Sequence, residues 1–235
     1  MEYENQANEG KTLEDKVITM DNYLEKRAEI EGQLDEMLEM AKEMVDGMLA
    51  NLDKSEEKVK MRDGVEISMF VYRPKSLESQ DAAPCYFYAH GGGAWSLAAR
   101  HVEANMMQTA LSLNCVVFNI DYRLAPEHKC PGGQQDYVDC MKYVFANATK
   151  FRIQPDKTVM AGCSGGGYIA VGAANLLAKS NELGNVKALF IHTGMLSNAT
   201  QHIPKDKLEK YDTDYMGEPD VTTSYFKLLA TDWDN

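Results

Sequence analysis

The chain has 235 residues, 44% of them apolar and 26% charged, which allows one large domain or two small ones with a sizeable core and excludes disordered and fibrous proteins. The net charge is −12, and residues 1–60 contribute most of it, with 17 acidic and 8 basic side chains. An acidic surface repels phosphate backbones and anionic lipids, so neither nucleic acid nor a membrane is expected as the main partner.

Nothing in the sequence predicts membrane insertion or secretion. No apolar run approaches the ~18 uncharged residues that a bilayer-spanning helix needs, and the N-terminus opens with acidic residues instead of the basic and apolar segments of a signal peptide. Five widely spaced cysteines argue against a disulfide framework and for a reducing compartment, so we expect a cytoplasmic protein. The cysteines are Cys85, Cys115, Cys130, Cys140 and Cys163.

An amphipathic helix of about 16 residues is predicted between Leu34 and Met48, where apolar residues recur at the three-and-four spacing of one helix face. Its methionines could form an adaptable groove for a partner, but a helix laid over the core of the main domain is the simpler interpretation. We therefore divide the chain into an acidic helical region, residues 1–60, and a main domain, residues 61–235.

From Val65 the apolar period changes to two, and Pro74 ends the run, which predicts a strand. Four short apolar runs follow, separated by roughly 30–40 residues with helical patterns, as strand-helix-strand units produce. These runs are Cys85–Ala89, Cys115–Ile120, Thr158–Ala161 and Leu189–Ile191. Runs that are apolar at every position suit parallel strands buried on both faces. The predicted fold class is α/β, with a mostly parallel central sheet, and chemistry is expected in the loops after its strands.

Residues 162–166 read G-C-S-G-G, a G-x-S-x-G pattern between a predicted strand and an apolar helix. Small residues let a strand turn sharply into a helix, which holds the central Ser164 exposed at the positive end of the helix dipole. We interpret Ser164 as a nucleophile. Cys163 is an alternative nucleophile, but its place before the apex turns it away from the pocket.

The same glycines partly fit a dinucleotide-binding fingerprint, G-x-G-x-x-A from Gly165 to Ala170. That motif needs its first glycine directly after the strand and an acidic residue at the end of the next strand. Here Gly-Cys-Ser separates the strand from that first glycine, and the nearest acid, Glu182, falls in a polar loop. The pattern therefore favours a nucleophilic serine over a dinucleotide-binding loop.

His90, Gly91, Gly92 and Gly93 follow the predicted strand that ends at Ala89. Successive glycines allow the backbone to turn several N–H groups towards one point, which is what a developing oxyanion requires. We expect His90 to hold this loop in shape through hydrogen bonds, in preference to a role as catalytic base.

A third loop, residues 121–128, reads D-Y-R-L-A-P-E-H, and its charged residues Asp121, Arg123 and Glu127 are expected to form an ion-pair network that fixes the loop. A metal site is not expected, because the nearby His128, Cys130 and Cys140 match no zinc-ligand spacing.

The three loops together resemble the hormone-sensitive-lipase-like branch of the α/β-hydrolases, the α/β-hydrolase fold-3 group of carboxylesterases. Its members carry an HGGG loop, a DYRLAPE loop and a GDSAGG elbow in this order, and the similarity runs from about residue 65 to residue 235. The resemblance implies a serine esterase that acts on small acyl esters through an acyl-enzyme and needs no cofactor, with the N-terminal helices as part of the cap over the pocket. It places the nucleophile at Ser164, the oxyanion hole at Gly91, Gly92 and the N–H of Gly165, and the acyl pocket near Gly93 and Trp95.

Two elbow residues depart from the pattern: Cys163 stands where the family has Asp, and Gly165 where it has Ala. The family's acid and base follow the serine, and the resemblance implies that they would come after residue 235, in roughly 60 further residues. We therefore expect the 235-residue chain by itself to hydrolyse esters little or not at all. His192, at a strand end beside the pocket, remains a substitute base, while Asp232 and Asp234 are candidate acids by residue type only.

Two further expectations follow. The strand around Lys187–His192 would become an exposed edge without the acid-bearing strand beside it, which predicts poor solubility or self-association. A non-catalytic, ligand-binding member of the same branch, comparable to the gibberellin receptors, is the alternative function.

Overall fold

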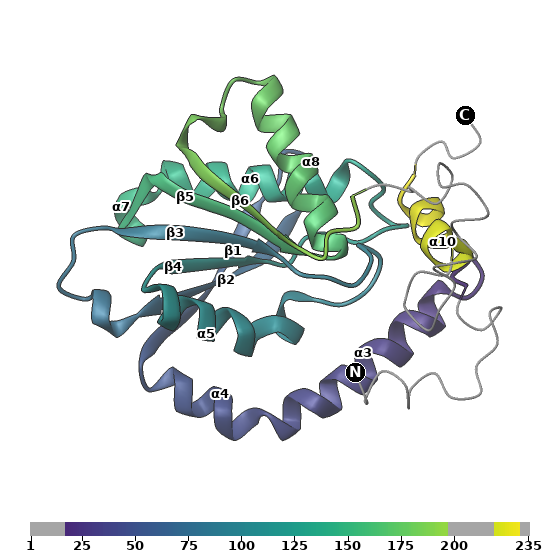
Figure 1. Ribbon diagram of the computed structural model, residues 1–235, viewed down its shortest axis with the longest axis horizontal. Helices are drawn as coiled ribbons and strands as arrows, with labels where there is room; N and C mark the ends of the chain where they lie inside the picture. Colours follow the sequence, from purple (N-terminus) through teal and green to yellow (C-terminus); the bar gives the residue numbers. More distant parts are fainter. Residues whose placement is uncertain (1–16, 197–218, 231–235) are drawn as a thin grey trace, which may run out of the picture.

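The computed structural model describes residues 17–196 and 219–230, and a six-stranded sheet forms its centre (Figure 1). The strand order is β1-β2-β4-β3-β5-β6. β3, β4, β5 and β6 are mutually parallel, while β1 and β2 are antiparallel to their neighbours. The strands are β1 (Leu52–Lys60), β2 (Glu66–Pro74), β3 (Ala83–Ala89), β4 (Val116–Ile120), β5 (Ile153–Cys163) and β6 (Val186–His192). The predicted α/β class with a mostly parallel sheet is confirmed.

All five predicted strands form, as β2 to β6, but β1 was not predicted. β1 lies at the outer edge of the sheet, and seven of its nine residues are exposed or only partly buried, so its sequence lacks an apolar alternation. Only Leu52 and Val59 turn into the core. The sequence-based boundary at residue 60 thus assigns one strand of the sheet to the helical region.

Alternating residues of the central strands face two separate apolar layers. Phe87 of β3 stacks on Phe118 of β4 at 4.8 Å between ring centroids, and both pack in the larger core cluster. Their sequence neighbours Tyr86 and Val117 turn to the other face and join the smaller cluster. Because strand side chains alternate with a period of two, runs that are apolar throughout give two buried faces.

Helices cover both faces, as Figure 1 shows. α6 (Gly132–Ala146) and α8 (Gly165–Lys179) contribute apolar side chains to the larger cluster, and the short α7 (Ala148–Phe151) ends in it. α5 (Glu103–Leu113) covers the other face through Met106, Met107 and Ala110. The predicted elbow helix is α8, which begins directly after the serine.

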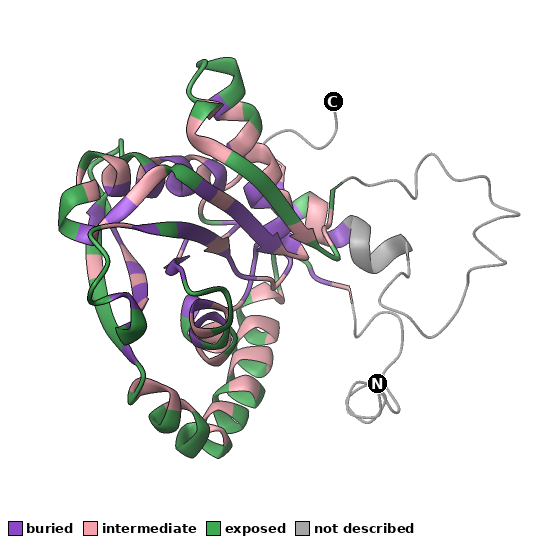
Figure 2. Cartoon of the chain, turned by 60° about the vertical axis from the view of Figure 1, so that its left-hand side comes forward, coloured by how far each residue is buried: buried purple, intermediate pink, exposed green. Residues whose placement is uncertain are grey.

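The N-terminal helix is two helices, α3 (Tyr23–Met40) and α4 (Lys42–Leu49), which lie along one side of the molecule (Figure 2). The last turn of α4 packs against the smaller cluster, as predicted for a helix laid over the core. α3 packs less deeply: Tyr23 and Ile30 lie partly buried against the larger cluster, and no residue of α3 is fully buried. The exposed fractions of Met37, Met40 and Met44 are 55%, 79% and 57%.

The last strand of the sheet, β6, is an edge in the described part of the chain, as expected. Leu189 and Phe190 are 42% and 57% exposed. After the gap in the description, α10 (Pro219–Leu229) buries Leu228 and Leu229 in the larger cluster. Among the described residues, no helix has the length and apolar character needed to cross a membrane.

Candidate active site

Ser164 lies at the turn between β5 and α8, as predicted. Its backbone has φ 52° and ψ −119°, a conformation that non-glycine residues rarely adopt and that costs about 1–3 kcal/mol. Hydrogen bonds hold the turn: Ser164 N–H donates to the His192 carbonyl at 3.0 Å, and its own carbonyl accepts from Met195 N–H at 3.0 Å. The hydroxyl does not cap α8. The strained turn therefore leaves this hydroxyl available at the start of a helix.

The glycine loop after β3 lies directly against Ser164. A Cβ placed on Gly91 would be 3.6 Å from the Cβ of Ser164. Gly92 has φ +96°, and its carbonyl accepts hydrogen bonds from the N–H groups of Trp95 and Ser96 at 3.1 and 2.9 Å. Within residues 17–196 and 219–230, the N–H groups of Gly91 and Gly92 donate to no backbone carbonyl. Two unused donors thus lie in the segment that touches the serine.

Gly165 gives a physical reason for one departure from the family pattern. A Cβ at this position would lie 2.4 Å from the nitrogen of Ala94 and 2.6 Å from the carbonyl carbon of Gly93. The glycine loop and the elbow approach each other too closely for the alanine that the family has here. The sequence alone showed the substitution, and the contact explains it.

Gly93 also lies close to the side chain of Trp95. A Cβ on Gly93 would be 2.7 Å from the indole ring of Trp95 and 3.3 Å from the ring of Tyr225. Trp95 is 2% exposed, and its ring lies 5.8 Å from that of Tyr225 on α10. The indole therefore forms a packed wall between the loop and α10, and sequence reasoning missed Tyr225.

His90 supports the glycine loop from inside the fold. Its Nδ1 lies 2.8 Å from the Gly91 carbonyl, its ring stacks on Tyr122 at 4.3 Å, and the Tyr122 hydroxyl donates to the His90 carbonyl at 2.8 Å. Complete burial lowers the pKa of His90 to about 4, so the imidazole is neutral at pH 7. These contacts agree with the predicted structural role of this histidine.

His192 approaches the elbow through its backbone, and its side chain turns to Cys163. The carbonyl accepts from Ser164 N–H, whereas Nδ1 of the exposed ring lies 3.7 Å from Cys163 Sγ. Within the described residues, no histidine or carboxylate side chain forms a hydrogen bond with the Ser164 hydroxyl. The candidate acids Asp232 and Asp234 lie outside the described residues.

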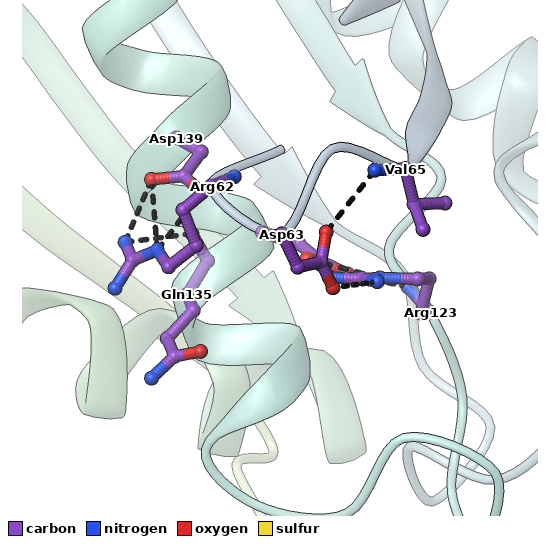
Figure 3. A network of polar contacts seen from close by, with 7 residues as sticks. Arg62, Asp63, Val65, Arg123, Gln135 and Asp139 are labelled. Atoms are coloured by element: carbon purple, nitrogen blue, oxygen red, sulfur yellow. Dashed lines mark hydrogen bonds and ion pairs between the residues drawn. The ribbon is translucent and has the colours of Figure 1, made fainter. Parts of the chain in front are cut away.

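The ionic network of the third loop differs from the predicted one. Arg123 does not pair with Asp121 or Glu127; it forms a bidentate ion pair with the fully buried Asp136, with contacts of 2.6 and 3.0 Å, and also binds Asp63 (Figure 3). The hydrogen bonds that the Arg123 guanidinium donates to the Asp136 carboxylate raise the pKa of Arg123 above its usual value. Asp121 instead accepts from the N–H of Ala99 at 2.7 Å. The loop is fixed by ion pairs, as expected, but its partners come from α6 and from the β1–β2 turn.

Arg27 of α3 is a further residue that the sequence did not reveal. Its guanidinium donates to the carbonyls of Trp95 and Ala125 at 2.7 and 2.8 Å and forms a bidentate pair with Glu127 at 2.9 Å. One turn along, Glu31 accepts from the N–H of Leu97 at 3.1 Å. α3 thus clamps the segment that follows the glycine loop. The four-residue spacing was visible in the sequence, but the backbone partners were not.

Similarity to known proteins agrees with this geometry. The family model of the alpha/beta hydrolase fold matches residues 86–235, from β3 through the elbow to the last residue given. The chain belongs to the α/β-hydrolase fold-3 family. The matched residues include the glycine loop after β3 and the turn between β5 and α8.

The relatives include known esterases. Over 123 residues the chain is 35% identical to carboxylesterase NlhH of Mycobacterium tuberculosis, a match that covers 52% of this chain and 38% of that protein. Over 127 residues it is 33% identical to an arylesterase of Saccharolobus solfataricus, covering 54% and 40%. A solved hyperthermophilic esterase of Pyrobaculum calidifontis superposes with a TM-score of 0.69 at 26% identity, over 83% of this chain and 63% of that one. The matches thus span less than half of the two curated relatives.

Proposed function

We propose that this α/β-hydrolase cleaves carboxylic esters with Ser164 as nucleophile. The observation that carries the proposal is the strained backbone of Ser164 at the start of α8, with Gly91 in contact beside it. Such a turn costs free energy, and the surrounding hydrogen bonds hold it in place, which is characteristic of a site where strain serves function. Esterase relatives support the same reaction class.

In this mechanism, Ser164 Oγ attacks the ester carbonyl carbon while a histidine base takes the hydroxyl proton. The N–H groups of Gly91, Gly92 and Gly165 stabilise the negative charge on the carbonyl oxygen. The alcohol leaves with the proton from the histidine, and water then hydrolyses the acyl-enzyme. A carboxylate must orient the histidine, and in this family the acid and base follow the serine in sequence.

The substrate we infer is a small acyl ester, bound against Gly93 and Trp95, with His192 at the pocket rim. The indole is an apolar group beside the glycine loop, packed against Gly93 and Tyr225. The helices of residues 1–60 belong to the cap, because α3 holds the segment after the glycine loop through Arg27. We infer a cytoplasmic location, and the five free cysteines support it, because disulfides are rare in reducing compartments.

A fluorophosphonate probe tests the nucleophile, because it forms a covalent adduct with an activated serine. We expect Ser164→Ala to reduce labelling of the whole protein by about a thousandfold or more, with an unchanged circular dichroism spectrum. Ser180→Ala is the matched control, since Ser180 follows the other end of α8, and it should keep full labelling.

Labelling at Cys163 in the Ser164→Ala variant, or a merely twofold loss, would contradict the assignment. Wild-type protein that takes no label and turns over no p-nitrophenyl ester, yet binds a small ligand, would favour the non-catalytic alternative.

A further inference from the structure

A second reactive pair lies beside the serine, formed by Cys163 at the end of β5 and His192 at the end of β6. The two residues are register partners in the sheet, and Nδ1 of the imidazole lies 3.7 Å from the thiol sulfur. The hydroxyl of Thr193 lies at the same distance from that sulfur. Cys163 is partly exposed and His192 is exposed. An imidazole in contact with a thiol can take its proton, and the thiolate is the reactive form of cysteine.

Among the described residues, the other four cysteines lack this combination of exposure and an imidazole neighbour. Cys85, Cys115 and Cys140 are buried, and burial raises the pKa of Cys85 to about 11 and that of Cys115 to about 12. Burial also holds the pKa of Cys140 well above its usual value. Cys130 is half-buried, with the Gln134 amide 3.6 Å from its sulfur. Selective chemistry at one thiol is therefore built into the fold.

Three titratable groups face Cys163 from neighbouring elements: His192 from β6, Tyr88 from β3 and Tyr122 from the loop after β4. Burial raises the pKa of both phenols, so Tyr88 and Tyr122 stay neutral near pH 7. The imidazole is thus the group in this cluster that can accept the thiol proton. Nδ1 accepts it when the ring carries its own hydrogen on Nε2.

We propose that Cys163 is a modification site for small disulfides, with His192 as its activating base. His192 Nδ1 takes the proton from Cys163, and the thiolate attacks one sulfur of the disulfide. A bond forms between Cys163 Sγ and that sulfur, the original sulfur–sulfur bond breaks, and the other half leaves as a thiolate that is then protonated. The product is a mixed disulfide one residue before Ser164. The inference does not depend on ester hydrolysis.

Dithiodipyridine is a suitable probe, because it is neutral and its leaving group absorbs light, so net protein charge does not affect access. At pH 7, one thiol should react about tenfold faster than the others, and peptide mass spectrometry should locate it at Cys163. His192→Gln should slow this phase about fivefold to tenfold at pH 7. Raising the pH should narrow the difference, because hydroxide in the solvent can then remove the thiol proton in place of the imidazole.

Two control variants separate the base from general effects. His128→Gln removes a different imidazole and should leave the fast phase unchanged, whereas Cys163→Ser should remove it. Ser164→Ala should retain it, so failure of the esterase proposal and failure of this one are distinguishable. First reaction at Cys130 or at a buried cysteine, equal rates at all five thiols, or a rate that His192→Gln does not alter would each overturn the proposal.

Discussion

At the ends of β3 and β5, the backbone is packed so closely that one added methyl group would not fit, whereas the neighbouring β6 exposes most of its side chains. A Cβ on Gly166 would lie 2.1 Å from the carbonyl oxygen of Ala89, and one on Gly162 would lie 2.2 Å from that of Gly166. On β6, Phe190 is 57% exposed. The difference shows that close contact between the ends of the central strands holds the glycine loop against the Ser164 turn. The edge strand β6 adds a backbone hydrogen bond to this turn, from Ser164 N–H to the His192 carbonyl.

The largest effect on stability is expected from a methyl group added where the ends of β3 and β5 meet. We expect Gly166→Ala to destabilise the protein by about 3 kcal/mol or more, because neither facing carbonyl can move without disturbing β3. The measurement is the free energy of unfolding in urea. Gly184→Ala is the control, since nothing lies within 4 Å of the added Cβ, and its effect should stay within about 0.5 kcal/mol. Equal effects of the two substitutions would refute the packing argument.

The ion pairs of Arg123 and Arg62 give a second contrast, between a buried and an exposed carboxylate partner. Asp136→Asn removes the charge that faces Arg123 in the interior, and it should cost about 3 kcal/mol. Asp139→Asn removes the partner of the more exposed Arg62, and it should cost under about 1 kcal/mol. Chemical denaturation measures the free energy of unfolding of both variants. A larger loss for Asp139→Asn than for Asp136→Asn would contradict the prediction.

The buried His90 predicts how the free energy of unfolding depends on pH. Its pKa is about 4 in the folded chain and about 6.5 when unfolded, so the unfolded state binds more protons between these values. Stability is therefore complete above pH 6.5 and is lost as the pH falls towards 4, by roughly 2 kcal/mol between pH 7 and pH 5. Urea denaturation at the two pH values should show this loss, and His90→Gln should show a correspondingly smaller one. An identical pH dependence in the variant would disprove the role of burial.

The smallest effect is expected at the β6 edge. Phe190→Lys should change the free energy of unfolding by less than about 0.5 kcal/mol, because the ring is already mostly exposed. The same substitution should lower the binding of a hydrophobic dye and the tendency to self-associate, since a lysine on an edge opposes pairing with other chains. Size-exclusion chromatography and dye fluorescence measure both. A loss of several kcal/mol would show that the edge is part of the core.

Sequence patterns were enough to predict the fold class, five of the six strands in the described residues, and the two loops that meet at Ser164. Apolar runs and glycine patterns are local signals, and the chemistry of a turn at Ser164 or of consecutive glycines at Gly91 and Gly92 depends mainly on neighbouring residues. The sequence patterns could not reveal β1, whose exposed residues carry no apolar alternation, or the break at Ala41 between α3 and α4.

Contacts between groups far apart in the sequence could not be predicted, because they depend on how the elements pack. The charges of residues 121–127 predicted ion pairs within the loop, yet Arg123 pairs with Asp136 on α6. Glu127 pairs with Arg27, which lies 100 residues earlier. Likewise, His192 was a candidate base for the serine, but the parallel register of β5 and β6 directs its ring to Cys163. Such pairings depend on how strands and helices pack, which local residue patterns do not predict.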